Sequence, residues 1–133
     1  MKTHIPLKSI LFICLGALLF LLTTPSPAPA APVEQTIFDC ANVTEIPQIE
    51  CEALVALYNS TNGVGWTTKT GWLQTNTPCS WTGVTCENAH VIKLDQHSRR
   101  LNGEIPPELG NLTSLKILYL GFNQLSGNIP VEI

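Results

Sequence analysis

Apolar positions in the C-terminal part of the chain repeat with a period of 24 residues. The positions that are identical after this shift are Leu94/Leu118, Leu101/Leu125, Gly103/Gly127, Ile105/Ile129, Pro106/Pro130 and Glu108/Glu132. Unrelated segments share far fewer residues, so the shift marks an internal repeat. Periods of about 20 to 50 residues are typical of solenoids, in which each copy buries its apolar side against the next copy.

Within the second copy, the spacing predicts a strand followed by a return path. Leu118 and Leu120 are two residues apart, so a strand directs both side chains to one side, the interior of a coil. Asn123 lies where the chain leaves that strand, and its amide can pair with backbone groups of neighbouring coils. The predicted repeat core comprises Leu94, Leu101, Ile105, Leu115, Leu118, Leu120, Asn123, Leu125 and Ile129, with Ile133 also on the interior return path.

The first copy departs from this pattern at two positions. Gln96 stands where Leu120 predicts an interior leucine, and Arg99 stands where Asn123 predicts the asparagine. A buried amide without partners costs about 1–3 kcal/mol. We therefore expect either that this edge is partly wet or that the first coil is weakened, and that Gln96→Leu raises the melting temperature.

A different pattern precedes the repeats. From Gln48, Cys51, Leu54, Val55 and Tyr58 follow one another at helical spacing, which predicts a helix near residues 48–60. Pro47 suits its first turn, and Gly63 suits a left-handed cap at its end.

Residues 63–90 have no sustained periodicity, but they contain the tryptophans Trp66, Trp72 and Trp81. These residues predict that the segment is ordered by aromatic packing, which we favour over a sugar-binding platform.

The first thirty residues are typical of an export signal. Lys2, His4 and Lys8 precede an apolar run over 10–22, which is shorter than the ~20 residues that a membrane-spanning helix needs. Ala28-Pro29-Ala30 has the form that signal peptidase accepts, so cleavage is predicted after Ala30; an uncleaved membrane anchor is the alternative. The predicted parts are a signal peptide (1–30), a cap (31–90) and repeats (91–114 and an incomplete 115–133).

Charge and cysteine usage narrow the class further. The chain has ten acidic and seven basic residues, a net charge of −3, with no basic run that would favour binding to nucleic acid.

Beyond the signal, the cysteines are Cys40, Cys51, Cys79 and Cys86, an even set that predicts disulfides in an exported chain. Three pairings are possible; the short loops favour Cys40–Cys51 with Cys79–Cys86. Zinc is the alternative, but the close cysteine pairs that it usually requires are missing.

These motifs resemble the plant-type leucine-rich-repeat class. The strand is followed by L-x-G-x-I-P at Leu101–Pro106 and Leu125–Pro130, and the segment before the repeats has C-x-W-x-G-V-x-C at Cys79–Cys86. The helix from Glu52 to Tyr58 and Trp66 also resemble that family's N-terminal cap. The resemblance implies an α/β fold: a helical cap, then about two coils of a solenoid with parallel strands on a concave face, which the family uses mostly to bind proteins, peptides or glycans.

By position on that face, Lys93, Asp95, His97 and Tyr119 are the candidate ligand contacts; the alternative is that they only solvate the strands. His90, Asp95 and His97 are candidate metal ligands or catalytic groups by residue type, and Asp95 and His97 share one side of the predicted strand. Nothing supplies a third ligand or a nucleophile with a base, so we expect no metal, no cofactor and no enzymatic activity. Asn42, Asn59 and Asn111 begin Asn-x-Thr sequences, which are glycosylation acceptors in a eukaryotic host.

The sequence therefore predicts a secreted recognition module, located outside the cell or in the cell envelope, and a fragment of a longer protein. Its expected partner is a protein, peptide or glycan, with membrane contact only through an uncleaved signal or a missing C-terminal region. Two alternatives stay open: the targeting and capping segment of a larger secreted enzyme or receptor, and a small disulfide-stabilised inhibitor.

Overall fold

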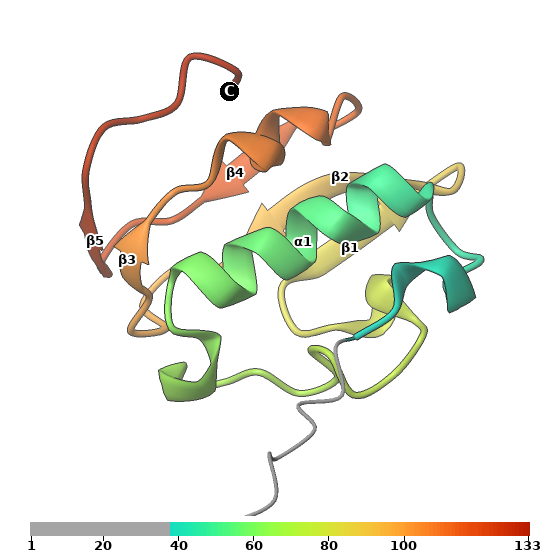
Figure 1. Cartoon of the computed structure of the whole chain (residues 1–133), viewed down its shortest axis with the longest axis horizontal. Helices are drawn as coiled ribbons and strands as arrows, with labels where there is room; N and C mark the ends of the chain where they lie inside the picture. The colour runs from blue at the N-terminus through green and yellow to red at the C-terminus, as the bar shows by residue number, and fades with distance from the viewer. Residues whose placement is uncertain (1–37) are drawn as a thin grey trace, which may run out of the picture. The chain divides into compact units, whose positions relative to one another are not determined.

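The computed structural model describes residues 38–133, and Figure 1 shows their arrangement. The predicted signal peptide, with its cleavage after Ala30, lies outside the described residues. The elements are η1 (Cys40–Asn42), α1 (Gln48–Ser60), η2 (Gly63–Gly65), η3 (Pro78–Ser80), β1 (Val84–Glu87), β2 (His90–Asp95), β3 (Asn102–Glu104), η4 (Pro107–Asn111), β4 (Ile117–Tyr119) and β5 (Gln124–Ser126). Among the described helices, none is both long and apolar enough to span a membrane.

Helix α1 begins directly after Pro47, whose missing N–H leaves no helical donor unpaired. Its core side carries Cys51, Leu54 and Leu57, whereas Val55 and Tyr58, which we expected on the same face, are only half buried. At its end, the left-handed cap predicted at Gly63 is wrong, because Asn62 takes that conformation with φ 54°. A glycine is still required at position 63, since an added Cβ would collide with the Tyr58 ring.

The strands form two sheets that join the successive coils. In the larger sheet, of order β1-β2-β4, β1 pairs with β2 antiparallel and β2 pairs with β4 parallel. Leu94 lies opposite Leu118, which is the 24-residue shift found in the sequence. In the smaller sheet, β3 and β5 pair in parallel, with Gly103 opposite Leu125. Adjacent parallel strands of this kind agree with the predicted solenoid, in which successive coils pair side by side.

The core lies between the large sheet and α1. Leu94 and Leu101 from the first coil are fully buried and share one cluster with Leu54 and Leu57 from α1. The remaining repeat leucines and Ile105 are partly buried against this cluster; they are Leu115, Leu118, Leu120 and Leu125. The core therefore crosses the boundary between cap and repeats.

The predicted burial of Ile129 and Ile133 is wrong. Ile129 is 73% exposed and Ile133 is 49% exposed. Both residues lie on the return path of the last described coil, beyond β5, and no further described coil stacks on its outer side. An interior position in a solenoid becomes buried only when a neighbouring coil covers it.

Asn123 joins the two coils as its position predicts. Its Oδ1 accepts hydrogen bonds from the backbone N–H groups of Arg99 (2.9 Å) and Leu101 (3.1 Å). Its Nδ2 donates to the carbonyl oxygens of Gln96 (2.7 Å) and Leu120 (2.8 Å). The side chain thereby satisfies backbone groups of both coils that the strands leave unpaired.

The tryptophans order the irregular segment by packing, as expected. Trp66, Trp72 and Trp81 are all buried, with ring centroids 4.8 Å apart for Trp66 and Trp72 and 5.1 Å apart for Trp72 and Trp81. Each indole N–H donates to a backbone carbonyl, those of Thr61, Thr82 and Thr75 respectively. Their rings are therefore not available as a sugar-binding platform.

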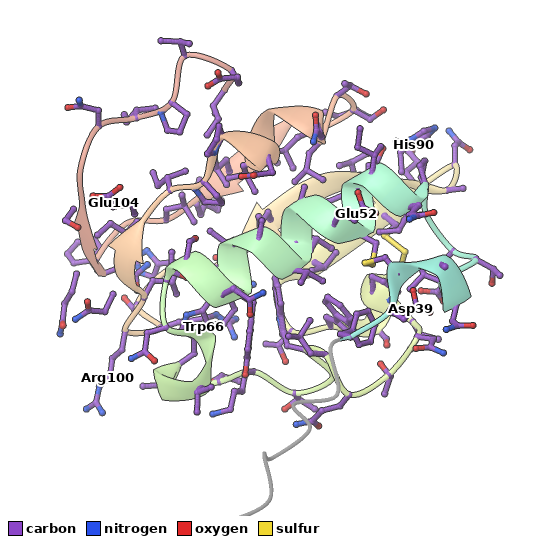
Figure 2. All side chains as sticks on the ribbon, viewed as in Figure 1. Asp39, Glu52, Trp66, His90, Arg100 and Glu104 are labelled. Carbon is purple, nitrogen blue, oxygen red and sulfur yellow. A yellow bond between two sulfur atoms is a disulfide. The ribbon has the colours of Figure 1, made fainter. Side chains whose placement is uncertain are left out.

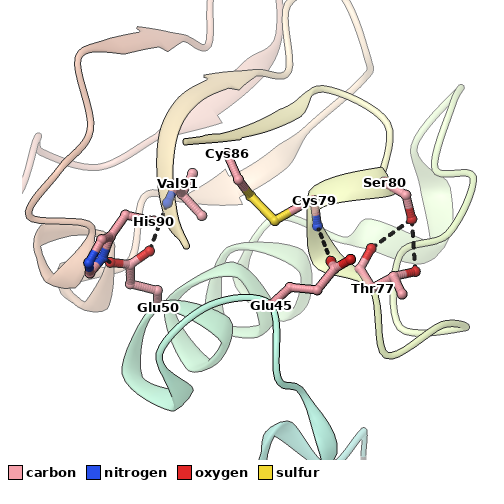
Figure 3. Close-up of a disulfide and its surroundings, with 8 residues drawn as sticks. All are labelled: Glu45, Glu50, Thr77, Cys79, Ser80, Cys86, His90 and Val91. Atoms are coloured by element: carbon pink, nitrogen blue, oxygen red, sulfur yellow. Dashed lines mark hydrogen bonds and ion pairs between the residues drawn. A yellow bond between two sulfur atoms is a disulfide. The ribbon is translucent and has the colours of Figure 1, made fainter. Parts of the chain in front are cut away.

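Disulfides crosslink the segment before the repeats, and their pairing is the one favoured from the sequence. Cys40 is joined to Cys51, which ties η1 to α1. Cys79 is joined to Cys86, which ties η3 to β1, and Figure 3 shows this bond. The backbone N–H of Cys79 also donates to the Glu45 carboxylate at 3.0 Å, so the segment before α1 is held to the same turn.

Candidate ligand-binding face

Alternation along β2 and β4 separates the core residues from the candidate contacts. Leu94 and Leu118 turn towards the core, so their strand neighbours turn to the opposite, outer side of the sheet. The register places Lys93 beside Ile117 and Asp95 beside Tyr119. We call this outer surface the strand face; it comprises Lys93, Asp95, His97, Ile117, Tyr119 and Phe122.

Three of the predicted contact residues form one charged and aromatic cluster. The Lys93 Nζ lies 3.2 Å from the Asp95 Oδ2 and 5.6 Å from the centroid of the Tyr119 ring. A cation at this distance from an aromatic ring is attracted by the electrons of its face. The structure therefore brings Lys93, Asp95 and Tyr119 together from two neighbouring coils.

The charge state of Asp95 follows from these contacts. Its partial burial raises the pKa of the carboxyl, but other contacts outweigh this effect: the hydrogen bonds from Lys93 and from the His97 backbone N–H, and the positive charges of Lys93 and Arg99. The pKa of Asp95 consequently lies below its usual value. This carboxylate stays negatively charged at mildly acidic pH.

The fourth predicted residue, His97, lies slightly apart and contacts Phe122. Their ring centroids are 5.0 Å apart with the planes at 66°, an edge-to-face contact. Phe122 is 85% exposed, and it follows β4 with a left-handed backbone, φ 55°. Position on the strand did not select Phe122 as a contact, because it lies just beyond the strand end.

The strand face combines apolar anchors with a few charges. Tyr119 is 53% exposed and Ile117 39% exposed, and both lie next to the Lys93–Asp95 pair. Exposed aromatic residues surrounded by polar groups are typical of surfaces that bind other proteins or peptides. Within residues 38–133 there is no group of three side chains placed to hold a metal ion.

His90 makes a structural contact instead of joining Asp95 and His97. Its Nδ1 lies 2.6 Å from the carboxylate of Glu50, which also accepts the Val91 backbone N–H at 2.8 Å, as Figure 3 shows. Glu50 is buried in the first turn of α1. The pair thus fastens the start of β2 to the start of the helix.

Comparisons with known proteins agree with this architecture. The model of the leucine rich repeat N-terminal domain matches residues 49–87, which run from α1 to the end of β1. A probable inactive receptor kinase of Arabidopsis thaliana, RLK902, is 37% identical over 79 residues. That alignment covers 59% of this chain and 12% of the relative, so the chain spans only a small part of the relative's length.

Solved structures show the same fold. The leucine-rich-repeat ectodomain of the receptor kinase SOBIR1 from Arabidopsis thaliana matches with a TM-score of 0.51 and 30% identity, covering 66% of this chain and 48% of that chain. A structure of PEPR1–AtPEP1 matches with a TM-score of 0.50 and 30% identity, covering 62% of this chain and 12% of that chain. Together with the 24-residue register of β2 and β4, these likenesses show that the chain has the fold of a leucine-rich-repeat solenoid, and that residues 49–87 match the N-terminal domain of such proteins.

Proposed function

We propose that the chain is the ligand-recognising start of an exported leucine-rich-repeat protein, and that its strand face contacts a protein or peptide. The observation that carries this proposal is the exposed cluster of Tyr119, Lys93 and Asp95 on neighbouring parallel strands. Binding energy at such surfaces is concentrated in a few aromatic and charged residues. Continued coils would extend the same face.

Export is supported by two features. The first thirty residues have the pattern of a signal peptide, and the disulfides of the cap are of a kind that persists outside reducing compartments. The solved structure of the SOBIR1 ectodomain and that of PEPR1–AtPEP1 have the same fold, which supports a receptor-type role for a longer protein.

A second candidate function is that residues 38–133 only cap the solenoid and that ligand binding lies elsewhere. This reading is favoured by the small share of RLK902 that the chain covers, 12%. Genomic sequence downstream of Ile133 distinguishes the two candidate functions. Further 24-residue copies with exposed aromatic residues at the Tyr119 position extend the proposed face, whereas a different domain favours a capping role.

The direct test uses binding variants. The immobilised full chain is used to select binders from the extracellular protein and peptide fraction of the host. The Kd of each binder is then measured for the unchanged chain and for Tyr119→Ala. We expect Kd to rise about tenfold or more, which corresponds to ~1.4 kcal/mol. Ile49→Ala, a change of an exposed apolar side chain on α1, is the control and should leave Kd unchanged. An unchanged Kd for Tyr119→Ala, or an equal loss for Ile49→Ala, contradicts the proposal.

A further inference from the structure

The Asn-x-Thr sequences all fall on the side of the molecule that is opposite the strand face. Asn42 ends η1, Asn59 lies in the last turn of α1 and Asn111 ends η4. Helix α1 contacts η4, and the Cys40–Cys51 disulfide ties η1 to α1. Figure 1 shows α1 and the orange turn of residues 107–111 in front of β2 and β4. Within residues 38–133, none of the strands contains an Asn-x-Ser or Asn-x-Thr sequence.

The asparagine side chains are open to a modifying group. Asn42 and Asn59 are exposed, and Asn111 is half exposed. The Asn42 Nδ2 donates to the Asp39 Oδ2 at 2.8 Å. A glycosylated amide nitrogen keeps one hydrogen, so this bond is compatible with a sugar at Asn42. The Thr61 hydroxyl donates to the Leu57 carbonyl oxygen at 2.6 Å and caps α1, so it stabilises the fold as well as completing the acceptor sequence of Asn59.

Asn59 also borders a groove beside α1. The groove has a volume of about 440 Å³, and the α1 wall carries Glu52, Val55, Ala56 and Asn59 at helical spacing. Phe38 and Asp39 line it from the segment before η1, with Gln48 at the start of α1 and Glu108 from η4. Figure 2 labels two of the lining residues, Asp39 just before η1 and Glu52 in the N-terminal half of α1. The groove therefore offers apolar surface from Phe38 and Val55, with carboxylate acceptors around it.

We propose that Asn42, Asn59 and Asn111 carry N-linked glycans, and that the first sugar of the Asn59 glycan occupies this groove. An N-acetylhexosamine matches the lining, because its ring has an apolar face and its hydroxyl and amide groups are donors for carboxylates. The proposal rests on the exported role, since glycosylation requires entry into a eukaryotic secretory pathway.

The chemistry needs a polyprenyl-pyrophosphate-linked oligosaccharide as co-reactant. The asparagine amide nitrogen forms a bond to the anomeric carbon of the sugar. The bond between that carbon and the pyrophosphate oxygen breaks, and polyprenyl pyrophosphate leaves with the electron pair. The amide loses one proton to a base of the transferase, and no redox step is involved.

Occupancy is measured on the full chain secreted by a eukaryotic host. Treatment with a glycan-removing amidase in heavy-oxygen water converts each glycosylated asparagine to labelled aspartate, which peptide mass spectrometry locates. We expect the label at Asn42, Asn59 and Asn111. Asn59→Gln should remove one glycan, whereas Thr61→Ser, which keeps the acceptor sequence, should retain it. An exported chain that is unlabelled at Asn59 overturns the proposal.

The groove is tested by hydroxyl-radical labelling of Phe38 and Val55. An endoglycosidase that leaves the first sugar should keep both side chains protected, whereas the amidase should raise their labelling several-fold. If labelling rises equally after both enzymes, the first sugar does not occupy the groove. Protection that survives the amidase means that another occupant, such as a second copy of the chain, covers it, and this also overturns the groove assignment.

A second arm separates this proposal from the proposed export. It uses the chain with residues 1–30 replaced by a secretory leader of the same host. If only this arm yields a labelled product, the chain's own leader does not direct export and the proposed function fails, while the acceptor sites are upheld. If the exported product of either arm is unlabelled at Asn59, the glycan proposal fails.

Discussion

At the scale of single residues, Gln96 is the position where the sequence pattern and the packing conflict most directly. Its side chain is fully buried, with Nε2 donating to the Thr82 carbonyl oxygen at 2.9 Å. Among the described residues, its Oε1 has no hydrogen-bond partner. The Thr82 oxygen also accepts from the Trp72 indole N–H at 2.9 Å, so it remains satisfied without Gln96.

We therefore predict that Gln96→Leu stabilises the protein. The change removes a buried unpaired oxygen, which costs about 1–3 kcal/mol, and gives up one hydrogen bond worth about 1 kcal/mol. A net gain of about 1 kcal/mol raises the melting temperature by roughly 4–8 °C in a domain of this size. Thermal unfolding followed by circular dichroism measures it. Gln96→Ala is the control and should lower the melting temperature, because it leaves a cavity. A lower melting temperature for Gln96→Leu would contradict the prediction. It would show that the Gln96 amide stabilises the protein by more than its buried unpaired oxygen costs.

The sequence showed that Gln96 departs from the repeat, but it did not show its partner. Thr82 lies in a segment without periodicity, and only the folded backbone brings its carbonyl to the first coil. Arg99 is similar, since its guanidinium donates to the carbonyl of Thr68 in the same irregular segment at 3.3 Å. Both departures occur where the first coil meets the cap instead of another coil.

At the scale of elements, the disulfides differ in how the fold protects them. Cys40 in η1 and Cys51 in α1 are both buried, whereas Cys79 and Cys86 are only half buried. Thiol exchange requires access of the attacking thiolate to a sulfur. We predict that limiting reductant opens Cys79–Cys86 several-fold faster than Cys40–Cys51 in the native protein, as measured by alkylation and peptide mass spectrometry.

Denaturant supplies the control for this prediction. In the unfolded chain both bonds are exposed, so their reduction rates should become similar. Faster reduction of Cys40–Cys51 under native conditions would mean that η1 opens away from α1, and it would contradict the burial argument. Loss of either crosslink should also destabilise the cap by about 2–4 kcal/mol.

Elements with strong periodicity could be predicted from the sequence, and those fixed by unusual backbone conformations could not. The helix over Gln48–Ser60 and the pairing of Leu94 with Leu118 follow from spacing. The antiparallel partner of β2 was missed, because the turn between β1 and β2 uses Asn88 and Ala89 at positive φ, 52° and 62°. Alanine rarely adopts that conformation, so the turn has no Asn-Gly signal. On the strand face, position identified Tyr119 and Lys93, but their contact needed the register.

At the scale of the whole molecule, the sheets end at β4 and β5 on the side away from the cap. Beyond them, Ile129 is 73% exposed and Val131 is 95% exposed. In a solenoid, stability is approximately the sum of the coil terms and the interfaces between neighbours. The outer side of β4 and β5 is therefore a surface on which one more coil should add stability.

We predict that a second copy of residues 110–133, appended directly after Ile133, raises both the denaturant midpoint and the m-value. The copy continues the 24-residue register, so its strand can pair with β4 and its leucines can cover Ile129. The m-value grows because more surface is buried in one cooperative unit. Urea unfolding followed by circular dichroism measures both quantities.

The matched control carries Leu118→Asp and Leu120→Asp in the appended copy only. It has the same length, but burying the two carboxylates would cost more than the coil gains, so its midpoint should equal that of the original chain. If the unsubstituted copy gives no gain over this control, the outer edge of β4 does not accept a coil. The stacking of adjacent coils, on which an extended strand face depends, would then not continue beyond β4.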